Sequence, residues 1–184
     1  MASLIPNILK ESSQSRGETL IFNYFKNEQT ITKDWIVLHS LDIAQHRKKK
    51  RGEADFIFLI PNKGILCVEV KAHSEVSRKE GIWYLGDQKG ESPFDQVRDN
   101  SEVIIRQLKD LSFSYKTFVT HVVIFTHCPI KEKSIEWNDW ELIDSDEELI
   151  ISDTDHYLIW NSSFFNKEIR KKEIDGCVMV FPEP

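Results

Sequence analysis

The residues with the clearest capacity for chemistry are two acids and a lysine, Asp55, Glu69 and Lys71. Glu69 and Lys71 are separated by one residue within an apolar run, so a strand would project both side chains from the same face. A charge buried on such a strand without a partner is costly, and exceptions of this kind are expected at functional sites. The residue types and their spacing therefore predict carboxylates and an ammonium group at one point.

Two short apolar runs carry these residues, and a strong turn signal, Pro61-Asn62-Lys63-Gly64, joins them. If the loop between the two strands has an odd number of residues, Asp55 lies opposite Glu69, and Glu53 lies opposite Lys71. A loop of three residues (61–63) or of five (60–64) meets this condition. A loop with an even number of residues would place the two acids on different faces of the sheet.

Converging carboxylates suit a hard divalent cation such as Mg²⁺, which keeps coordination positions for water and phosphate oxygens. Such a cation would polarise a phosphoryl group, lower the pKa of a bound water and stabilise the leaving oxygen. Lys71 would orient or help deprotonate the attacking water, or stabilise charge in the transition state, and the residues alone leave these roles open. The competing explanation is structural: the Asp55 side chain caps the edge of a strand, while Glu69 and Lys71 form a surface ion pair that contributes little stability.

The pattern around these residues predicts an α/β sandwich with a mixed sheet. Ser92-Pro93-Phe94-Asp95 is a well-formed helix start, with a serine N-cap, a proline at the first helical position and an acid in the first turn. The expected helices are 16–29 and 92–111, with helical pieces near 144–151 and 163–172. The expected strands are 35–43, 53–60, 65–72, 75–79, 82–85 and 118–126, with later strands near 140–143 and 177–181.

Five short segments, each weak alone, occur in the same order and at suitable intervals for a known family. They are Arg16-Gly17-Glu18, Gly52-Glu53-Ala54-Asp55-Phe56, Val68-Glu69-Val70-Lys71, Gly81-Ile82-Trp83 and Pro93-Phe94-Asp95-Gln96. Over roughly residues 16–126 the chain resembles the nuclease-related domain (NERD), a branch of the PD-(D/E)XK nuclease superfamily. The resemblance implies a restriction-endonuclease-like αβββαβ core, with a mixed central sheet flanked by helices.

The resemblance also implies roles for single residues. The acid and the E-x-K positions of the family's active site correspond to the three residues described first, and Gln96 resembles a helix glutamine thought to assist near the metal or substrate. Ala54 stands where the superfamily's name pattern has proline, a residue with no chemical role of its own. The implied catalytic residues are Asp55, Glu69, Lys71 and Gln96. The implied ligands of Mg²⁺ or Mn²⁺ are Glu18, Asp55, Glu69 and the backbone carbonyl of Val70.

Each further candidate also has an ordinary structural explanation. Glu18 fits a solvated acid in the first turn of a helix, which the helix dipole favours. Gln96 fits a surface residue, and Glu53 fits an ion-pair partner of Lys71 outside the catalytic set. His73 lies near the motif, but a histidine in a loop or at a sheet edge is the better explanation.

A run of five cations forms the second feature of interest: Arg47, Lys48, Lys49, Lys50 and Arg51. Such a run is commonly a solvated loop, but next to Asp55 it would neutralise DNA phosphates and bind without regard to base sequence. The net charge of −6 does not exclude this, because the acidity is concentrated late in the chain. Residues 1–116 hold 18 Lys and Arg against 16 Asp and Glu, whereas residues 117–184 hold 6 against 14.

The converging acids and the lysine predict a Mg²⁺- or Mn²⁺-dependent phosphodiesterase, and the resemblance implies that it is a deoxyribonuclease that hydrolyses phosphodiester bonds of DNA, in repair or in defence against foreign DNA such as phage. The resemblance also implies a helicase or other ATPase partner. The sequence contains no phosphate-binding glycine loop, so this partner would lie on another chain or in a further region, and association into homo-oligomers is left open. The first alternative is a non-catalytic DNA-binding module of a larger helicase or defence assembly. The second is a protein-interaction domain whose acidic C-terminal third docks on a basic partner.

The 184 residues fit one domain, which we divide into a nuclease-like core (1–130) and a C-terminal extension packed on it (131–184). The 40% hydrophobic and 11% aromatic content excludes a disordered chain. No apolar stretch approaches the ~20 residues of a membrane span, and we expect no secretory signal. Three distant cysteines, with Cys67 expected as a buried thiol, indicate a reducing cytoplasm.

Overall fold

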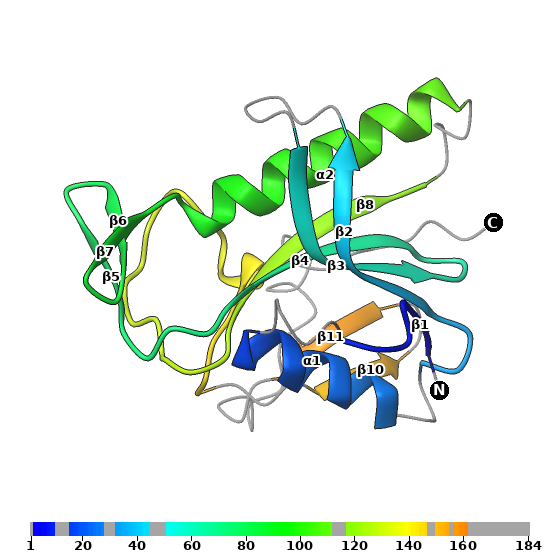
Figure 1. Ribbon diagram of the computed structural model, residues 1–184, viewed down its shortest axis with the longest axis horizontal. Helices are drawn as coiled ribbons and strands as arrows, with labels where there is room; N and C mark the ends of the chain where they lie inside the picture. The colour runs from blue at the N-terminus through cyan, green and yellow to red at the C-terminus, as the bar shows by residue number, and fades with distance from the viewer. Residues whose placement is uncertain are drawn as a thin grey trace.

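The computed structural model describes residues 2–9, 15–27, 32–44, 51–111, 117–146, 150–154 and 157–161. Within these residues, a six-stranded mixed sheet forms the centre of the molecule, and two α-helices pack against it (Figure 1). This architecture confirms the predicted α/β fold, with a mixed central sheet flanked by helices. The helices are α1 (Arg16–Asn27) and α2 (Pro93–Asp110).

The strands of the central sheet lie in the order β1-β2-β3-β4-β8-β9. β2, β3 and β4 are antiparallel to their neighbours in this group, whereas β1 runs parallel to β2, and β8 runs parallel to both β4 and β9. A parallel connection needs a long crossover, and α2 lies in the one between β4 and β8. The bounds are β1 (Ser3–Ile5), β2 (Ile36–Ala44), β3 (Arg51–Ile60), β4 (Gly64–Lys71), β8 (Val119–Phe125) and β9 (Leu142–Ile143).

A tight turn joins β3 to β4 and sets their register. Ile60 pairs with Gly64, so the loop contains the three residues 61–63, and Asn62 adopts a positive φ of 60° within it. Asparagine tolerates this left-handed conformation better than most residues. The ladder continues to the pair of Phe56 with Val68. The loop therefore has three residues, one of the two odd lengths under which Asp55 was expected to lie opposite Glu69.

The two helices cover opposite faces of the sheet. Phe25 of α1 packs with Phe56 of β3 and Val68 of β4 in one cluster of buried side chains. Phe94 of α2 packs in a second cluster with Cys67, the neighbour of Val68 in β4. Successive strand residues point to opposite faces, so the near-continuous apolar run of β4 is buried from both sides. Burial raises the pKa of the Cys67 thiol to about 11, in agreement with the predicted buried thiol.

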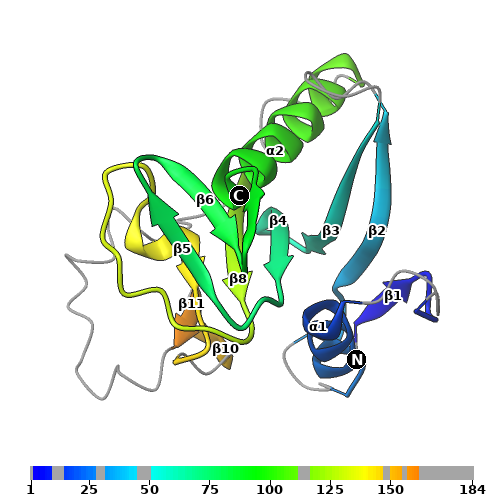
Figure 2. The same ribbon diagram turned by 60° about the vertical axis from the view of Figure 1, so that its left-hand side comes forward.

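A smaller antiparallel sheet lies between β4 and α2 in the sequence and stands to one side of the central sheet (Figure 2). Trp83 anchors it, because its ring lies 5.8 Å from that of Phe94, 6.3 Å from that of Phe125 and 5.4 Å from that of Trp137. The predicted hairpin at this place is confirmed, and a third strand extends it. The strands are β5 (Val76–Lys79), β6 (Ile82–Leu85) and β7 (Gln88–Gly90).

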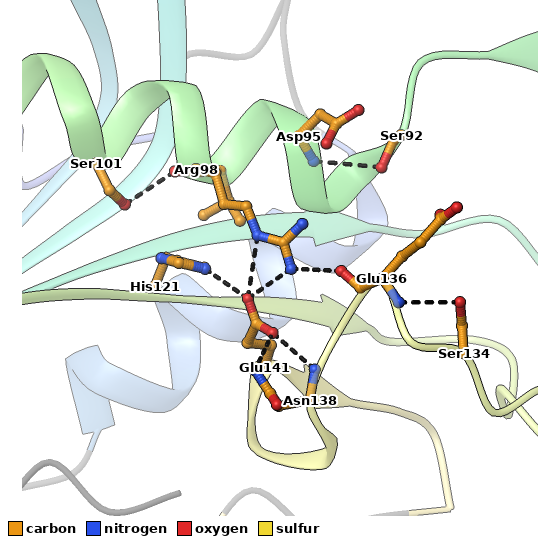
Figure 3. Close-up of polar contacts among 10 residues, drawn as sticks. Ser92, Asp95, Arg98, Ser101, His121, Ser134, Glu136, Asn138 and Glu141 are labelled. Carbon is orange, nitrogen blue, oxygen red and sulfur yellow. Dashed lines mark hydrogen bonds and ion pairs between the residues drawn. The ribbon is translucent and has the colours of Figure 1, made fainter. Parts of the chain in front are cut away.

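A buried acid ties the segment that follows β8 to the core (Figure 3). Glu141 accepts hydrogen bonds from Arg98 of α2, at 2.8 Å from Nη2, and its Oε1 lies 2.7 Å from Nε2 of His121 in β8. Its other carboxylate oxygen accepts bonds from the backbone and side-chain nitrogens of Asn138, at 2.7 and 2.9 Å. Glu141 is 2% exposed, so this ion pair is part of the interior.

The expectations for the region beyond residue 129 were met only in part. The strand expected near 140–143 is a 3₁₀ turn (Asp139–Glu141) followed by the short β9. The helical piece expected near 144–151 is wrong, because residues 145 and 146 form a turn and β10 (Ile150–Thr154) pairs with β11 (Tyr157–Asn161). The helix at 163–172 and the strand at 177–181 lie outside the described residues. In the described part of the chain, no helix is both long and apolar enough to cross a membrane.

Candidate active site

The central sheet forks where the predicted chemical residues lie. β3 stays paired with β2 as far as the pair of Arg51 with Ala44, but its ladder with β4 ends at Phe56 and Val68. Beyond this point β4 remains paired with β8 as far as Lys71 and Phe125. We call the opening between β3 and β4 at residues 53–55 and 69–71 the fork. Backbone groups at the fork lack ladder partners between the two strands and need others.

A side chain supplies one of these partners, and a second side chain holds the β3 arm. A carboxylate oxygen of Asp55 accepts a hydrogen bond from the Val70 backbone N–H at 2.7 Å, so Asp55 replaces the ladder bond with its side chain. On the β3 arm, the Glu53 carbonyl accepts a bond from the Asn100 side-chain amide of α2 at 3.2 Å. Asn100 is 3% exposed. The fork is thus held open by specific hydrogen bonds.

The backbone carbonyl of Val70 also belongs to the fork. Residues of odd number in β4 bond to β8, because the Ile65 N–H donates to Phe118 and the Lys71 carbonyl accepts from Thr126. Alternate residues of a strand direct their backbone groups to opposite neighbours, so Val70 directs its N–H and C=O toward β3. Its N–H meets Asp55 there, beyond the last ladder pair, which places the carbonyl at the same opening.

The other predicted residues meet on the β4 arm, on the face covered by α2. The Lys71 ammonium donates to Glu69 Oε1 at 2.5 Å and to Gln96 Oε1 at 2.8 Å. Glu69 and Lys71 are largely buried, with side chains 7% and 14% exposed. The Gln96 Nε2 amide donates in turn to Glu91 at 3.0 Å. Lys71 is therefore oriented by one partner from its own strand and one from α2.

Helix α1 brings a further acid toward the fork from the opposite face. A Cβ added at Gly17 would lie 2.7 Å from Thr126 Oγ1 and 2.8 Å from Val70 Cγ1, so only glycine lets the first turn approach β4 this closely. Ser15 begins the helix by accepting a bond from the Glu18 N–H at 3.1 Å. Glu18 is close enough to Asp55 to raise its pKa.

The electrostatics of the fork centre on Asp55. Burial raises its pKa well above the ordinary value, and the negative charge of Glu69 raises it further. The bond from the Val70 N–H opposes this rise, Glu18 adds to it and Lys71 opposes it. These contributions leave ionised Asp55 with more unfavourable than favourable interactions. A positive charge placed beside Asp55 and Glu69 would remove that penalty.

The donor set fits a hard divalent cation in its chemistry, because the available ligands are carboxylate and carbonyl oxygens. In the described part of the chain, however, no three His, Cys, Asp or Glu side chains form a group that could hold a metal ion. The contacts explain this arrangement, since Lys71 engages Glu69 and the Val70 N–H engages Asp55. What the structure assembles is a pair of acids, a backbone carbonyl and an oriented ammonium group.

The fork brings together five of the predicted residues: Asp55 with Val70, and Glu69 with Lys71 and Gln96. It does not join Glu53 to Lys71, because the ladder ends before that pair and Glu53 uses its carbonyl toward Asn100. His73 is exposed beyond the end of β4.

Residues 47–50 of the predicted DNA-binding run lie outside the described residues, as does the side chain of Arg51. In the acidic patch at 144–148, Asp144 accepts backbone bonds from Ile130 and Asp146, while residues 147 and 148 are also outside the described part.

Sequence reasoning assigned no role to three supporting residues. Gly17 stands in the first motif segment, and Asn100 lies one turn after Gln96 on the same face of the helix, but the sequence does not show the partner of either. Glu91 gave no signal, because an acid before a helix N-cap is common.

A comparison with known protein families matches residues 13–126 to the family described as the nuclease-related domain, NERD. The match covers both helices and the strands β2 to β8, and therefore the whole fork. No curated protein matches the chain. No solved structure matches it either.

Proposed function

This chain belongs to the nuclease-related domain family, and from that premise we propose that it hydrolyses phosphodiester bonds of DNA with the help of Mg²⁺ or Mn²⁺. One observation carries the proposal: the fork between β3 and β4 gathers Asp55, Glu69, the Val70 carbonyl and Lys71 at the end of one strand pair. A protein that needed these strands only as structure would be more stable with the ladder continued through these residues.

The ligands we assign to the cation are Asp55, Glu69 and the Val70 carbonyl. Glu18 is the further ligand we assign, because it is close enough to Asp55 to raise its pKa. When bound, a divalent cation lowers the pKa of a bound water and stabilises charge on phosphate oxygens. The chain's own contribution is to hold two acids at a point where their charges repel. The rest of the fold is stable enough to hold the two acids together despite this repulsion, and a bound cation would relieve it.

Lys71 contributes a fixed positive charge. Its partners Glu69 and Gln96 restrain two of the three N–H bonds of the ammonium group, which leaves one for a phosphate oxygen or the attacking water. An ammonium held in this way needs little reorganisation when charge develops on the phosphate, and that is the basis of electrostatic catalysis.

DNA is the proposed partner, and the cationic run Arg47–Arg51 is the proposed source of phosphate contacts because it leads directly into β3. Charge contacts of this type weaken steeply with salt. We therefore expect the affinity for DNA to fall strongly as NaCl is raised. The roles in repair or defence, a helicase or other ATPase partner and self-association remain proposals that rest on the family alone.

The test uses circular and linear DNA incubated with the purified protein, with Mg²⁺ or with EDTA. We expect cleavage with Mg²⁺ and none with EDTA. Lys71→Ala should lower the cleavage rate by at least about 100-fold, the scale of losing one electrostatic donor. DNA affinity, measured in EDTA by fluorescence anisotropy, should change by less than about threefold, since one phosphate contact among several is lost.

Lys79→Ala is the matched control, because Lys79 is exposed on the small sheet and its loss also removes one positive charge. We expect it to cleave as the wild type does. Equal loss of cleavage and binding in Lys71→Ala, or DNA binding by a wild type that never cleaves, would favour the non-catalytic DNA-binding module instead.

A further inference from the structure

The fork residues end in a chain of hydrogen bonds that reaches the surface. Glu69 Oε1 accepts from Lys71, the Lys71 ammonium donates to Gln96 Oε1, and the Gln96 Nε2 amide donates to Glu91 Oε2. The distances are 2.5, 2.8 and 3.0 Å. Glu91 lies between β7 and the N-cap of α2, so the small sheet and not the central one delivers it.

The direction of this chain is determined by what its ends can do. An ammonium group only donates hydrogen bonds, and an ionised carboxylate only accepts them. The Gln96 amide stands between the two, so its carbonyl oxygen must face Lys71 and its NH₂ group must face Glu91. If Glu91 were neutral or absent, the amide could turn over, and its NH₂ group would then face the ammonium without a bond.

From this geometry we propose that Glu91 is a positioning residue for Lys71, which acts by fixing the orientation of the Gln96 side-chain amide. The inference rests on the proposed nuclease function for its consequence, but the orientation itself is a property of the folded protein. The route from Glu91 to Lys71 runs through Gln96, because the carboxylate accepts from the same amide whose oxygen holds the ammonium group.

The anchoring of the small sheet supports this role. Trp83 of β6 is 4% exposed and stacks among aromatic rings from α2, β8 and the segment after β8. Arg78 of β5 is ion-paired with Glu136 of that segment. The backbone that carries Glu91 is thus tied to the core at several points. A carboxylate on such a support can hold an amide in one orientation.

A double-mutant cycle tests the proposal. Glu91→Ala removes both the charge and the hydrogen-bond acceptor, so the Gln96 NH₂ group loses its partner. We expect the kcat for DNA cleavage to fall about tenfold, the lower end for a residue that orients a site residue. KM should change less than about twofold, because the proposed effect is on the orientation of Lys71 and not on the contacts that bind DNA. In a Gln96→Ala background, Glu91→Ala should have no further effect, because a residue that acts through another loses its effect when that residue is removed.

Glu80→Ala is the matched control. Glu80 is exposed at the turn between β5 and β6, so the same side chain is removed from the same sheet without touching the chain of bonds. It should cleave at the wild-type rate. Additive effects of Glu91→Ala and Gln96→Ala would overturn the proposal, as would wild-type kcat in Glu91→Ala.

A measurement without catalysis separates this inference from the proposed function. In ¹⁵N NMR spectra, the two side-chain NH₂ protons of Gln96 should exchange slowly with water in the wild type, because the amide is held between Lys71 and Glu91. In Glu91→Ala the NH₂ group has lost its acceptor, so its resonances should shift and its protons should exchange faster, whereas both should be unchanged in Glu80→Ala. This result would support the inference even if no DNA were cleaved, and unchanged Gln96 resonances in Glu91→Ala would refute it.

Discussion

Asp55 offers a direct test of the electrostatics at the fork, because its charge is unfavourable in the fold. Asp55→Asn keeps the shape of the side chain and retains an oxygen that can accept the Val70 N–H. It removes the negative charge that burial, Glu69 and Glu18 all disfavour. We therefore expect the variant to be inactive in cleavage and more stable than the wild type when no divalent cation is present.

The magnitude follows from opposing contributions. A hydrogen bond to a charged acceptor contributes about 1.5–3 kcal/mol and one to a neutral acceptor about 0.5–1.5 kcal/mol, so the substitution loses about 1 kcal/mol here. The pKa of Asp55 is nevertheless raised well above 3.8, which means that repulsion and burial outweigh all the favourable contacts. Each pH unit of that rise corresponds to about 1.4 kcal/mol. The expected net change is therefore a gain in stability, and each kcal/mol of it would raise the melting temperature by about 2–4 °C for a chain of this size.

The assay is thermal unfolding at pH 7 in EDTA and in Mg²⁺. Mg²⁺ at 100 times its Kd would stabilise the wild type by about 2.7 kcal/mol, and the variant, which has lost a ligand, should gain much less. The order of melting temperatures should therefore reverse between the two buffers. Asp87→Asn, an exposed acid in the β6–β7 turn, serves as the control and should melt with the wild type in both buffers.

The pH dependence gives the sign a second check. A raised pKa means that the fold favours protonated Asp55, so the cost of its charge is absent below 3.8 and grows as pH rises toward the pKa in the fold. The stability difference between Asp55→Asn and the wild type should therefore be smallest at the acid end, grow as pH rises, and level off above the pKa of Asp55 in the fold. If Asp55→Asn melts below the wild type in EDTA at pH 7, our account of the charge at the fork is wrong.

Two further predictions concern the supports of the site. Gly17→Ala should destabilise the fold by about 1–3 kcal/mol through overpacking, and it should slow cleavage, because α1 must withdraw from β4. Urea unfolding and a nuclease assay measure the two effects. Asn23→Ala, on the exposed side of α1, should change neither, and unchanged stability in Gly17→Ala would contradict the contact. Stability should fall as pH is lowered because of the His121–Glu141 pair. Burial lowers the pKa of His121, so the fold favours the neutral imidazole, and stability decreases as pH falls below 6.5 and the imidazole gains a proton. The pKa of Glu141 is lowered by its bonds from Asn138 and Arg98 despite burial, so its contribution is present above 4.5 and is lost as pH falls further. Between pH 7 and 5.5, the urea midpoint of unfolding should change less with pH in His121→Gln than in the wild type. Equal changes in the two proteins would refute this.

Much of the site could be predicted because it depends on local rules. The spacing of Glu69 and Lys71 is enough to place both on one face of β4, since side chains alternate along a strand. The turn signal at Pro61 predicts that β3 and β4 pair, but the number of loop residues that sets their register was left open. The N-cap signal at Ser92 gave α2 its start, and its hydroxyl does accept a bond from the Asp95 N–H at 3.2 Å. These features need only neighbours in sequence.

The fork and its supports could not be predicted in the same way. Beyond Phe56 the Asp55 carboxylate, and not a backbone carbonyl, meets the Val70 N–H, and Asn100 of a helix far away in sequence holds the Glu53 carbonyl. A helical piece was expected near 144–151 because the acids at 144–148 resemble a helix start, but Asp144 accepts from the backbone N–H groups of Ile130 and Asp146, and β10 begins at Ile150. Partners of this kind are chosen by tertiary packing, which overrides local propensity.

Helix α2 holds both arms of the fork and so fixes the distance between them. Asn100 grips the β3 arm through the Glu53 carbonyl, and Gln96 grips the β4 arm through Lys71. The two side chains are four residues apart and so lie about one helical turn, roughly 5.4 Å, from each other along the axis. A rigid turn of helix thus sets the separation of the two arms, and a ligand that binds between them must match that separation.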